Sequence, residues 1–533
     1  MVIPTSMLDP KTPPDVIVRT QARKPVTDPA LGIPVNVNKI GNPPNRLVTI
    51  GDSLTQGFQS GAIFKTHLSY PAMIARELGW HQLRIPTYGG PGDGLPLNLE
   101  TLLRDLEKRF GSKIGFWEFL PTLFFLRQYF STLENYWERG QGSHTPMQQK
   151  IDHNLAVYGW DLRNTLSRTA DICLNVLNQH PPQNDFFRLS VDHHNERAAV
   201  RVLNSARNQA SVALTPLQAA KALSDEGTDT PGIETLIVLI GANNALGSVL
   251  TFKVNWSDTG YEDMEFNDRY TVWRPIHFQA ELDRIVAEIK QIRAQHVILG
   301  TVGHVTIVPF ARGVDKKVRP DSRYFPYYTL PWIQDQDFDP QKHPHLTENE
   351  VRAIDSAIDQ YNDAITEAVR QARLEGRDWY VLETAGILDR LASRRYIEHP
   401  EARPDWWEEV GGEYPLPPEL QGLIPVPDSK LFLSDSEGRT QGGIFSLDGI
   451  HPTTIGYGIL AQEIIKIMQL AGVKFYESDG TERIGEIKVD FKRLIQEDTL
   501  ISHPPALFSN VRDWIGGIDK YFNIFSRLLT SNY

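Results

Sequence analysis

Cysteine is almost absent from this chain of 533 residues, in which Cys173 is the only one. One thiol excludes an intramolecular disulfide and a thiolate metal cluster built within a single chain. Cysteine chemistry is therefore not expected to be the mechanism, although a single thiol does not define the redox compartment.

Basic side chains are fewer than acidic ones, 54 against 66, so the formal net charge is -12. Such a balance disfavours long-range attraction to nucleic acid phosphates and to anionic lipid surfaces. We therefore expect no nucleic acid partner.

Long hydrophobic runs are also missing. The first 16 residues lack the basic patch and apolar run of a secretory signal, so we expect a cytoplasmic protein, or a secreted one if the chain starts after a removed signal. The most apolar stretch, 114–130, is interrupted by Glu118, Pro121 and Arg127 and is shorter than the roughly 20 apolar residues that span a bilayer. No transmembrane segment is expected.

What the sequence does contain is an alternation of short apolar runs and amphipathic segments. Strands are predicted at 46–50, 155–158, 235–240, 296–302 and 379–382, and helices at 70–78, 279–293, 348–373 and 455–470. Strands alternating with helices indicate an α/β fold with a parallel sheet that is covered on both faces. Ligands bind such sheets beyond the carboxyl ends of the strands.

The remaining segments define the predicted domain organisation. Residues 1–45 are rich in proline and are interpreted as an extended surface arm, and residues 46–475 as one catalytic domain. Helical insertions are predicted at about 80–150 and 167–232. Residues 476–533 form a C-terminal extension whose amphipathic pattern at 511–529 could dock on the body or on another subunit.

A candidate nucleophile, Ser53, directly follows the first predicted strand in the sequence Gly-Asp-Ser-Leu. The Gly-Asp-Ser tripeptide is weak evidence alone. Its position after a buried strand places the hydroxyl at the carboxyl edge of the sheet, where a nucleophile is useful.

A second candidate pair, Asp448 and His451, lies just before the last predicted helix. An Asp three residues before a His can accept the imidazole Nδ1–H and leave Nε2 to take a serine proton. The alternative is a helix cap, and the presence of Ser53 elsewhere favours the catalytic interpretation.

Asn243 follows the third predicted strand, where its amide could donate a hydrogen bond to an oxyanion. An Asn that only fills a turn is the alternative.

Together these motifs resemble the SGNH, or GDSL, hydrolases. The resemblance covers about 46–470 without the insertions, and it implies a three-layer α/β/α sandwich with a flavodoxin-like sheet. It also implies that Ser53 is the nucleophile of an esterase, His451 its base and Asp448 the group that orients the base. The Ser53 amide and Asn243 would belong to the oxyanion hole, and neither a metal nor a cofactor would be needed. The α/β-hydrolase fold is disfavoured because Thr55 replaces the last glycine of its Gly-x-Ser-x-Gly elbow.

The glycine of the family's oxyanion hole has two candidates, Gly159 and Gly92. Gly159 is preferred because a strand-like run precedes it, whereas Gly92 lies in a proline-rich loop. Asn244 stands where the family usually has Asp, which leaves the donor at Asn243 intact.

The substrate is expected to be a small-molecule ester, with a lipid-like or other apolar ester favoured by the aromatic residues of 80–150. Phe124 and Phe125 of that insertion, if it is a lid, and His304 after the fourth strand are the candidate substrate contacts. A helical subdomain core and a structural histidine are the alternatives. Acyl transfer with the same residues and a non-catalytic binding protein also stay open, as does the oligomeric state.

Overall fold

A four-stranded parallel sheet organises the chain in the computed structural model, which describes residues 4–36, 41–111, 118–145, 150–182, 191–226 and 230–506. Its strands are β1 (Asn45–Gly51), β4 (Ile233–Leu239), β5 (Ala294–Gly300) and β9 (Trp379–Leu382), in the order β1-β4-β5-β9. Every neighbouring pair is parallel. The predicted α/β class and four of the five predicted strands are confirmed.

The fifth predicted strand, 155–158, is only partly formed. The segment runs beside β1, where the Thr49 amide donates to the His153 carbonyl at 2.8 Å and the Leu155 amide donates to the Thr49 carbonyl at 2.8 Å. Only an isolated bridge at Asn154 results. Regular pairing stops because the Tyr158 amide donates to the Gln56 side chain and the chain then turns at Gly159.

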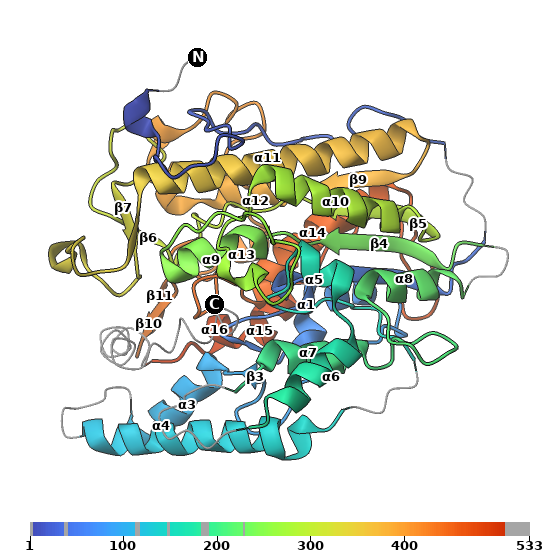
Figure 1. The fold of residues 1–533 in the computed structure, drawn as a ribbon, viewed down its shortest axis with the longest axis horizontal. Coiled ribbons are helices and arrows are strands. Elements are labelled where there is room, and N and C mark those ends of the chain that lie inside the picture. The colour runs from blue at the N-terminus through green and yellow to red at the C-terminus, as the bar shows by residue number, and fades with distance from the viewer. Residues whose placement is uncertain are drawn as a thin grey trace.

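Helices pack against this sheet in two groups (Figure 1). The helix α2 (Tyr70–Glu77) contacts β1, and α14 (Thr454–Leu470) contacts both α2 and β9. The helix α11 (Glu348–Leu374) contacts β5, β9 and α10 (Pro275–Ile289), and α8 (Pro216–Ser224) contacts β1 and α10. Of these, α14 is apolar on nearly every side, as a helix enclosed by other elements requires.

The insertions and loops supply the other elements. The further helices are α1 (Ser53–Gln56), α3 (Leu99–Phe110), α4 (Phe119–Glu134), α5 (Leu162–Ser167), α6 (Ala170–Gln179), α7 (His194–Leu203), α9 (Asn243–Thr251), α12 (Thr384–Leu391), α13 (Pro418–Gln421), α15 (Phe491–Glu497) and α16 (Thr499–Ser502). The small sheets are built from β2 (Ala62–Ile63) and β3 (Leu95–Pro96), from β6 (Arg312–Val314), β7 (Tyr327–Thr329) and β8 (His345–Thr347), and from β10 (Leu433–Asp435) and β11 (Gly438–Gln441).

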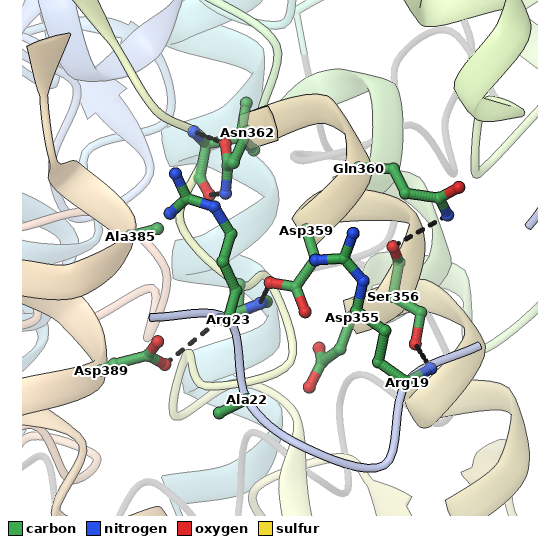
Figure 2. A network of polar contacts seen from close by, with 12 residues as sticks. Arg19, Ala22, Arg23, Asp355, Ser356, Asp359, Gln360, Asn362, Ala385 and Asp389 are labelled. Atoms are coloured by element: carbon green, nitrogen blue, oxygen red, sulfur yellow. Dashed lines mark hydrogen bonds and ion pairs between the residues drawn. The ribbon is translucent and has the colours of Figure 1, made fainter. Parts of the chain in front are cut away.

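The N-terminal arm is more firmly attached than a surface segment needs to be. Val16 and Val18 are buried in the core, and Arg19 and Arg23 both pair with Asp363 on α11. Figure 2 shows these two arginines lying over α11. The arm therefore packs along α11.

No helix within the described residues is long and apolar enough to cross a membrane. The amphipathic pattern predicted at 511–529 lies outside the described residues.

Candidate active site

The nucleophile candidate sits at a tight junction between strand and helix. The strand β1 ends at Gly51 and the short helix α1 begins at Ser53, with the Asp52 carboxylate accepting a hydrogen bond from the Leu54 amide at 3.1 Å. A Cβ atom on Gly51 would lie 2.4 Å from the Leu239 carbonyl oxygen of β4. Only glycine therefore fits where the chain leaves the sheet and presents Ser53.

A hydrogen-bonded chain joins the three residues Ser53, His451 and Asp448. The Ser53 Oγ lies 2.9 Å from His451 Nε2, although the two residues are 398 positions apart in the sequence. On the other side of the ring, His451 Nδ1 lies 3.0 Å from Asp448 Oδ2. With the proton on Nδ1 donated to the carboxylate, Nε2 is the acceptor for the serine hydroxyl.

The Asp448 carboxylate is buried but well supplied with donors. Its Oδ1 accepts from the Ile450 and His451 amides, each at 2.8 Å, and its Oδ2 also accepts from the Gly61 amide at 3.0 Å. Burial alone would raise the pKa of Asp448, but His451 and these backbone donors outweigh burial and hold the pKa below its usual value. The group is therefore ionised and can orient the imidazole.

Two loops hold this arrangement in place. The Ser60 amide donates to Ser446 Oγ at 2.8 Å, which fastens the loop after α1 to the loop that carries Asp448. The Phe58 ring lies 4.5 Å from the His451 ring, centroid to centroid. Because the imidazole packs against the Phe58 ring and is bonded to the Asp448 carboxylate, its orientation is fixed before a substrate binds.

The structure brings Asn243 and the turn at Gly159 together. Asn243 begins α9 directly beyond β4, and its Nδ2 donates to the Trp160 carbonyl at 2.8 Å. An amide nitrogen carries two hydrogens, so one remains for an oxyanion. Gly159 itself has φ +76°, and a Cβ atom there would lie 2.2 Å from Asn195 Nδ2.

Gly92 lies elsewhere. A Cβ atom on Gly92 would meet Leu133 and Tyr129, both on the insertion helix α4. Of the two glycine candidates, only Gly159 adjoins the residue bonded to Asn243.

Asn244 is turned away from this role. It is fully buried, and its Oδ1 accepts from the Leu162 amide at 3.4 Å. Asn244 therefore links the first turn of α9 to the first residue of α5.

Comparison of the chain with protein-family models and with curated proteins finds no match to either.

A pocket of about 140 Å³ opens on Ser53 and His451. We call it the Ser53 pocket, and its walls are mostly aliphatic side chains. They include Leu388 and Leu391 of α12 and Ile459 and Leu460 of α14. None of these was predicted, because a leucine that lines a cavity has the same sequence pattern as one that fills the core.

Two predicted substrate contacts lie away from this pocket. Phe124 is 76% exposed, and Phe125 packs against Phe110 and Tyr129 within the insertion. No described residue of 80–150 lines the Ser53 pocket. The helix α4 thus turns Phe124 toward solvent, which sequence periodicity could not distinguish from a turn toward the site.

His304 does line the Ser53 pocket, but both of its ring nitrogens are engaged. Its Nε2 lies 3.1 Å from Asp359 of α11, and its Nδ1 lies 3.2 Å from Asp389 of α12. Both acids are labelled in Figure 2. Burial alone would lower the pKa of His304, but Asp389 and the neighbouring Asp355 raise it to about 10. His304 is thus a charged link between α11 and α12 whose nitrogens are not available to a substrate.

Asp52 is a second buried acid beside the site. Burial raises the pKa of Asp52 to about 7, against the opposing effects of the Leu54 amide and His451. Between pH 4 and pH 7 the folded state thus keeps a proton that the unfolded chain, with an Asp pKa of about 3.9, has lost. The contribution of Asp52 to stability therefore falls as the pH rises through this window.

Asp52→Asn is expected to flatten this fall, because Asn keeps an oxygen for the Leu54 amide and cannot ionise. One pKa unit corresponds to about 1.4 kcal/mol, so the variant should gain at least about that much relative to wild type between pH 4 and pH 8. Urea denaturation of both proteins across this range measures the change. Since a new amide also affects stability at every pH, the slope with pH is the readout. Parallel curves would contradict the assignment.

Proposed function

We propose that this protein is a serine esterase that hydrolyses carboxylic esters through an acyl-enzyme on Ser53. The observation that carries the proposal is the continuous hydrogen-bonded chain from Asp448 through His451 to Ser53. Two acceptor–donor contacts of normal length, in the order acid, base and nucleophile, are what acyl transfer by serine requires.

In the proposed reaction, His451 Nε2 removes the hydroxyl proton while Ser53 Oγ attacks the ester carbonyl carbon. The negative oxygen of the tetrahedral intermediate accepts hydrogen bonds from the Ser53 and Gly159 amides and from Asn243 Nδ2. His451 then gives its proton to the leaving alcohol, and the acyl group stays on Ser53. Water, activated by His451 in the same way, releases the acid.

We further propose membership of the SGNH hydrolase family, with a three-layer, flavodoxin-like core. Two features support this proposal. The segment at 153–157 extends the sheet beyond β1. With the five segments numbered in chain order, so that 153–157 is the second, their order across the sheet is 2-1-3-4-5. Ser53, Gly159 and Asn243 also follow three successive members of this sheet, as the family's motifs do.

The favoured substrate is an ester with an apolar acyl chain. The Ser53 pocket places aliphatic side chains from α12 and α14 beside the nucleophile, and burial of each methylene contributes about 0.8 kcal/mol. A small, strongly polar acyl group would leave this surface unused.

A panel of p-nitrophenyl esters from acetate to laurate tests both the activity and this preference. We expect hydrolysis, with kcat/KM rising along the series until the pocket is filled. Leu388→Ala should lower kcat/KM for the longer esters by about tenfold, the loss that corresponds to about 1.4 kcal/mol of contact, and leave acetate nearly unchanged.

Phe124→Ala is the matched control, because it also shortens a large apolar side chain but at an exposed position outside the pocket. No hydrolysis of any ester would contradict the function. Equal losses in the two variants, or equal losses along the series, would contradict the acyl pocket.

A further inference from the structure

A second cavity, larger than the Ser53 pocket, is lined by basic side chains. Its volume is about 240 Å³, and five of its lining residues are cations, namely Arg312, Arg323, Arg394, Arg395 and Lys430. None of the described residues that line it is Asp or Glu. We call this the arginine cavity.

Three of the five cations are already paired with carboxylates outside the lining. Arg395 lies 2.9 Å from Asp355, and Lys430 lies 2.8 Å from Glu398. Arg312 uses one terminal nitrogen for Asp335, at 2.6 Å.

Arg323 and Arg394 differ from these three, because neither forms an ion pair with a carboxylate in the described part of the chain. Arg394 donates instead to the Gly313 carbonyl at 2.9 Å. Burial lowers the pKa of Arg394, and the nearby Arg312 lowers it further. Two positive charges are thus crowded at one wall of the cavity.

The hydrogen-bond donors at this cavity exceed the acceptors that the protein supplies. Arg323 is only 6% exposed and donates from Nε to the Tyr324 hydroxyl at 2.8 Å. Its two terminal nitrogens make no hydrogen bond of normal geometry to a described residue, although the Tyr396 hydroxyl lies beside the guanidinium. Arg312 likewise leaves Nε and Nη2 buried, with no acceptor for them among the described residues.

Such an arrangement is costly unless something occupies it. A buried donor without an acceptor loses the hydrogen bonds that water gave it in the unfolded chain, and the loss is larger when the group is charged. A ligand with several negatively charged oxygens would satisfy these donors and separate the crowded charges.

We propose that the arginine cavity binds a phosphate-type oxyanion. Guanidinium groups bind phosphate through paired N–H donors, and here the donors come from separate segments, so they can reach different faces of a tetrahedral anion. The cavity volume is far above the roughly 10–15 Å³ that one water molecule needs. The net charge of -12 does not oppose this site, because contacts at a few ångströms dominate over charges that solvent screens.

The cavity adjoins the proposed active site. Val308 lines both the arginine cavity and the Ser53 pocket. Two residues further on, the Phe310 amide donates to the carbonyl of Gly449, in the loop between Asp448 and His451, at 3.0 Å. The oxyanion is therefore either a free phosphate next to the site or the phosphate group of the ester substrate.

Calorimetric titration of the full chain with inorganic phosphate, against chloride at equal ionic strength, tests the binding directly. Phosphate at ten times its dissociation constant should raise the folded-to-unfolded ratio about elevenfold and therefore raise Tm. Arg312→Gln and Arg394→Gln, made singly because both side chains are only partly buried, should each weaken phosphate binding at least tenfold.

Arg46→Gln is the matched control, since Arg46 is also 17% exposed in its side chain and also pairs with a carboxylate, Glu234, but lies away from the cavity. It should bind phosphate as wild type does. No heat or Tm change beyond that of chloride, or undiminished binding in both cavity variants, would overturn the proposal. These readouts do not depend on esterase activity.

A kinetic comparison then identifies the source of the phosphate, and this step does rest on the proposed function. The substrates are an acyl ester of glycerol phosphate and the same acyl ester of glycerol. If the phosphate belongs to the substrate, Arg312→Gln raises KM for the first ester about tenfold and leaves the second unchanged. If it is a free anion, both esters respond alike to the substitution.

Discussion

Ser53→Ala is expected to abolish ester hydrolysis and to leave the fold intact. The substitution removes the only atom that can form the acyl-enzyme, and loss of a serine nucleophile typically costs on the order of 10⁴ to 10⁶ in kcat. The side chain has no other hydrogen-bond partner than His451 among the described residues, so the structure loses little. The p-nitrophenyl ester panel on wild type and variant, with circular dichroism for the fold, measures both effects.

A fluorophosphonate probe provides an independent readout for the same residue. It should label the wild-type protein at Ser53 and fail to label Ser53→Ala. Ser69→Ala is a suitable control, because that serine is also buried but its hydroxyl donates to the Thr66 carbonyl and does not contact His451. Near wild-type turnover by a folded Ser53→Ala protein would remove the basis of the proposed function.

Asn243→Ala is expected to lower kcat by about 10² to 10³, with a much smaller change in KM. Removal of one oxyanion donor costs about 3 kcal/mol in comparable enzymes, because the contact strengthens only as the oxygen becomes negative. The variant should therefore be slow but measurably active. A thermal melt separates this result from general destabilisation, because the lost bond to the Trp160 carbonyl would lower Tm, whereas a variant that stays folded at the assay temperature loses kcat only through the site.

The neighbouring Asn244 gives the internal control. Its side chain accepts from the Leu162 amide inside the protein, so Asn244→Ala should lower Tm. Its loss of kcat should be smaller than that of Asn243→Ala. A larger kcat loss at Asn244 than at Asn243 would mean that the oxyanion donor has been assigned to the wrong residue.

The fold class and the elements of the central sheet were accessible from sequence because they depend on local pattern. The β-branched runs ending at Gly51 and near Leu239 are long enough to identify buried strands without knowledge of their neighbours. The segment at 155–158 was harder, because its pairing depends on how Gln56 captures the Tyr158 amide. That contact joins residues about one hundred positions apart, and no local pattern encodes it.

The candidate site divides in the same way. Ser53, Asp448 and His451 could be selected from sequence because each lies in a short motif next to a predicted element. The walls of the site are different: Phe124 and Phe125 are candidate substrate contacts only if their insertion is a lid, whereas the Ser53 pocket is lined by leucines and isoleucines of α12 and α14. Aromatic content indicates that a segment buries area, but not which side of a helix faces the nucleophile.

By itself, the sequence determined the parallel α/β class, the position of Ser53 beyond the first strand, and the acid–histidine pair before α14. These features follow from local patterns, because periodicity and short spacings involve residues only a few positions apart in the sequence. Only the tertiary structure decided that His304 is a charged link, that Gly159 and not Gly92 precedes the residue bonded to Asn243, and that five cations from four separate segments line one cavity. The physical reason is that burial and charge pairing depend on which distant segments meet, and that is a property of the folded chain as a whole.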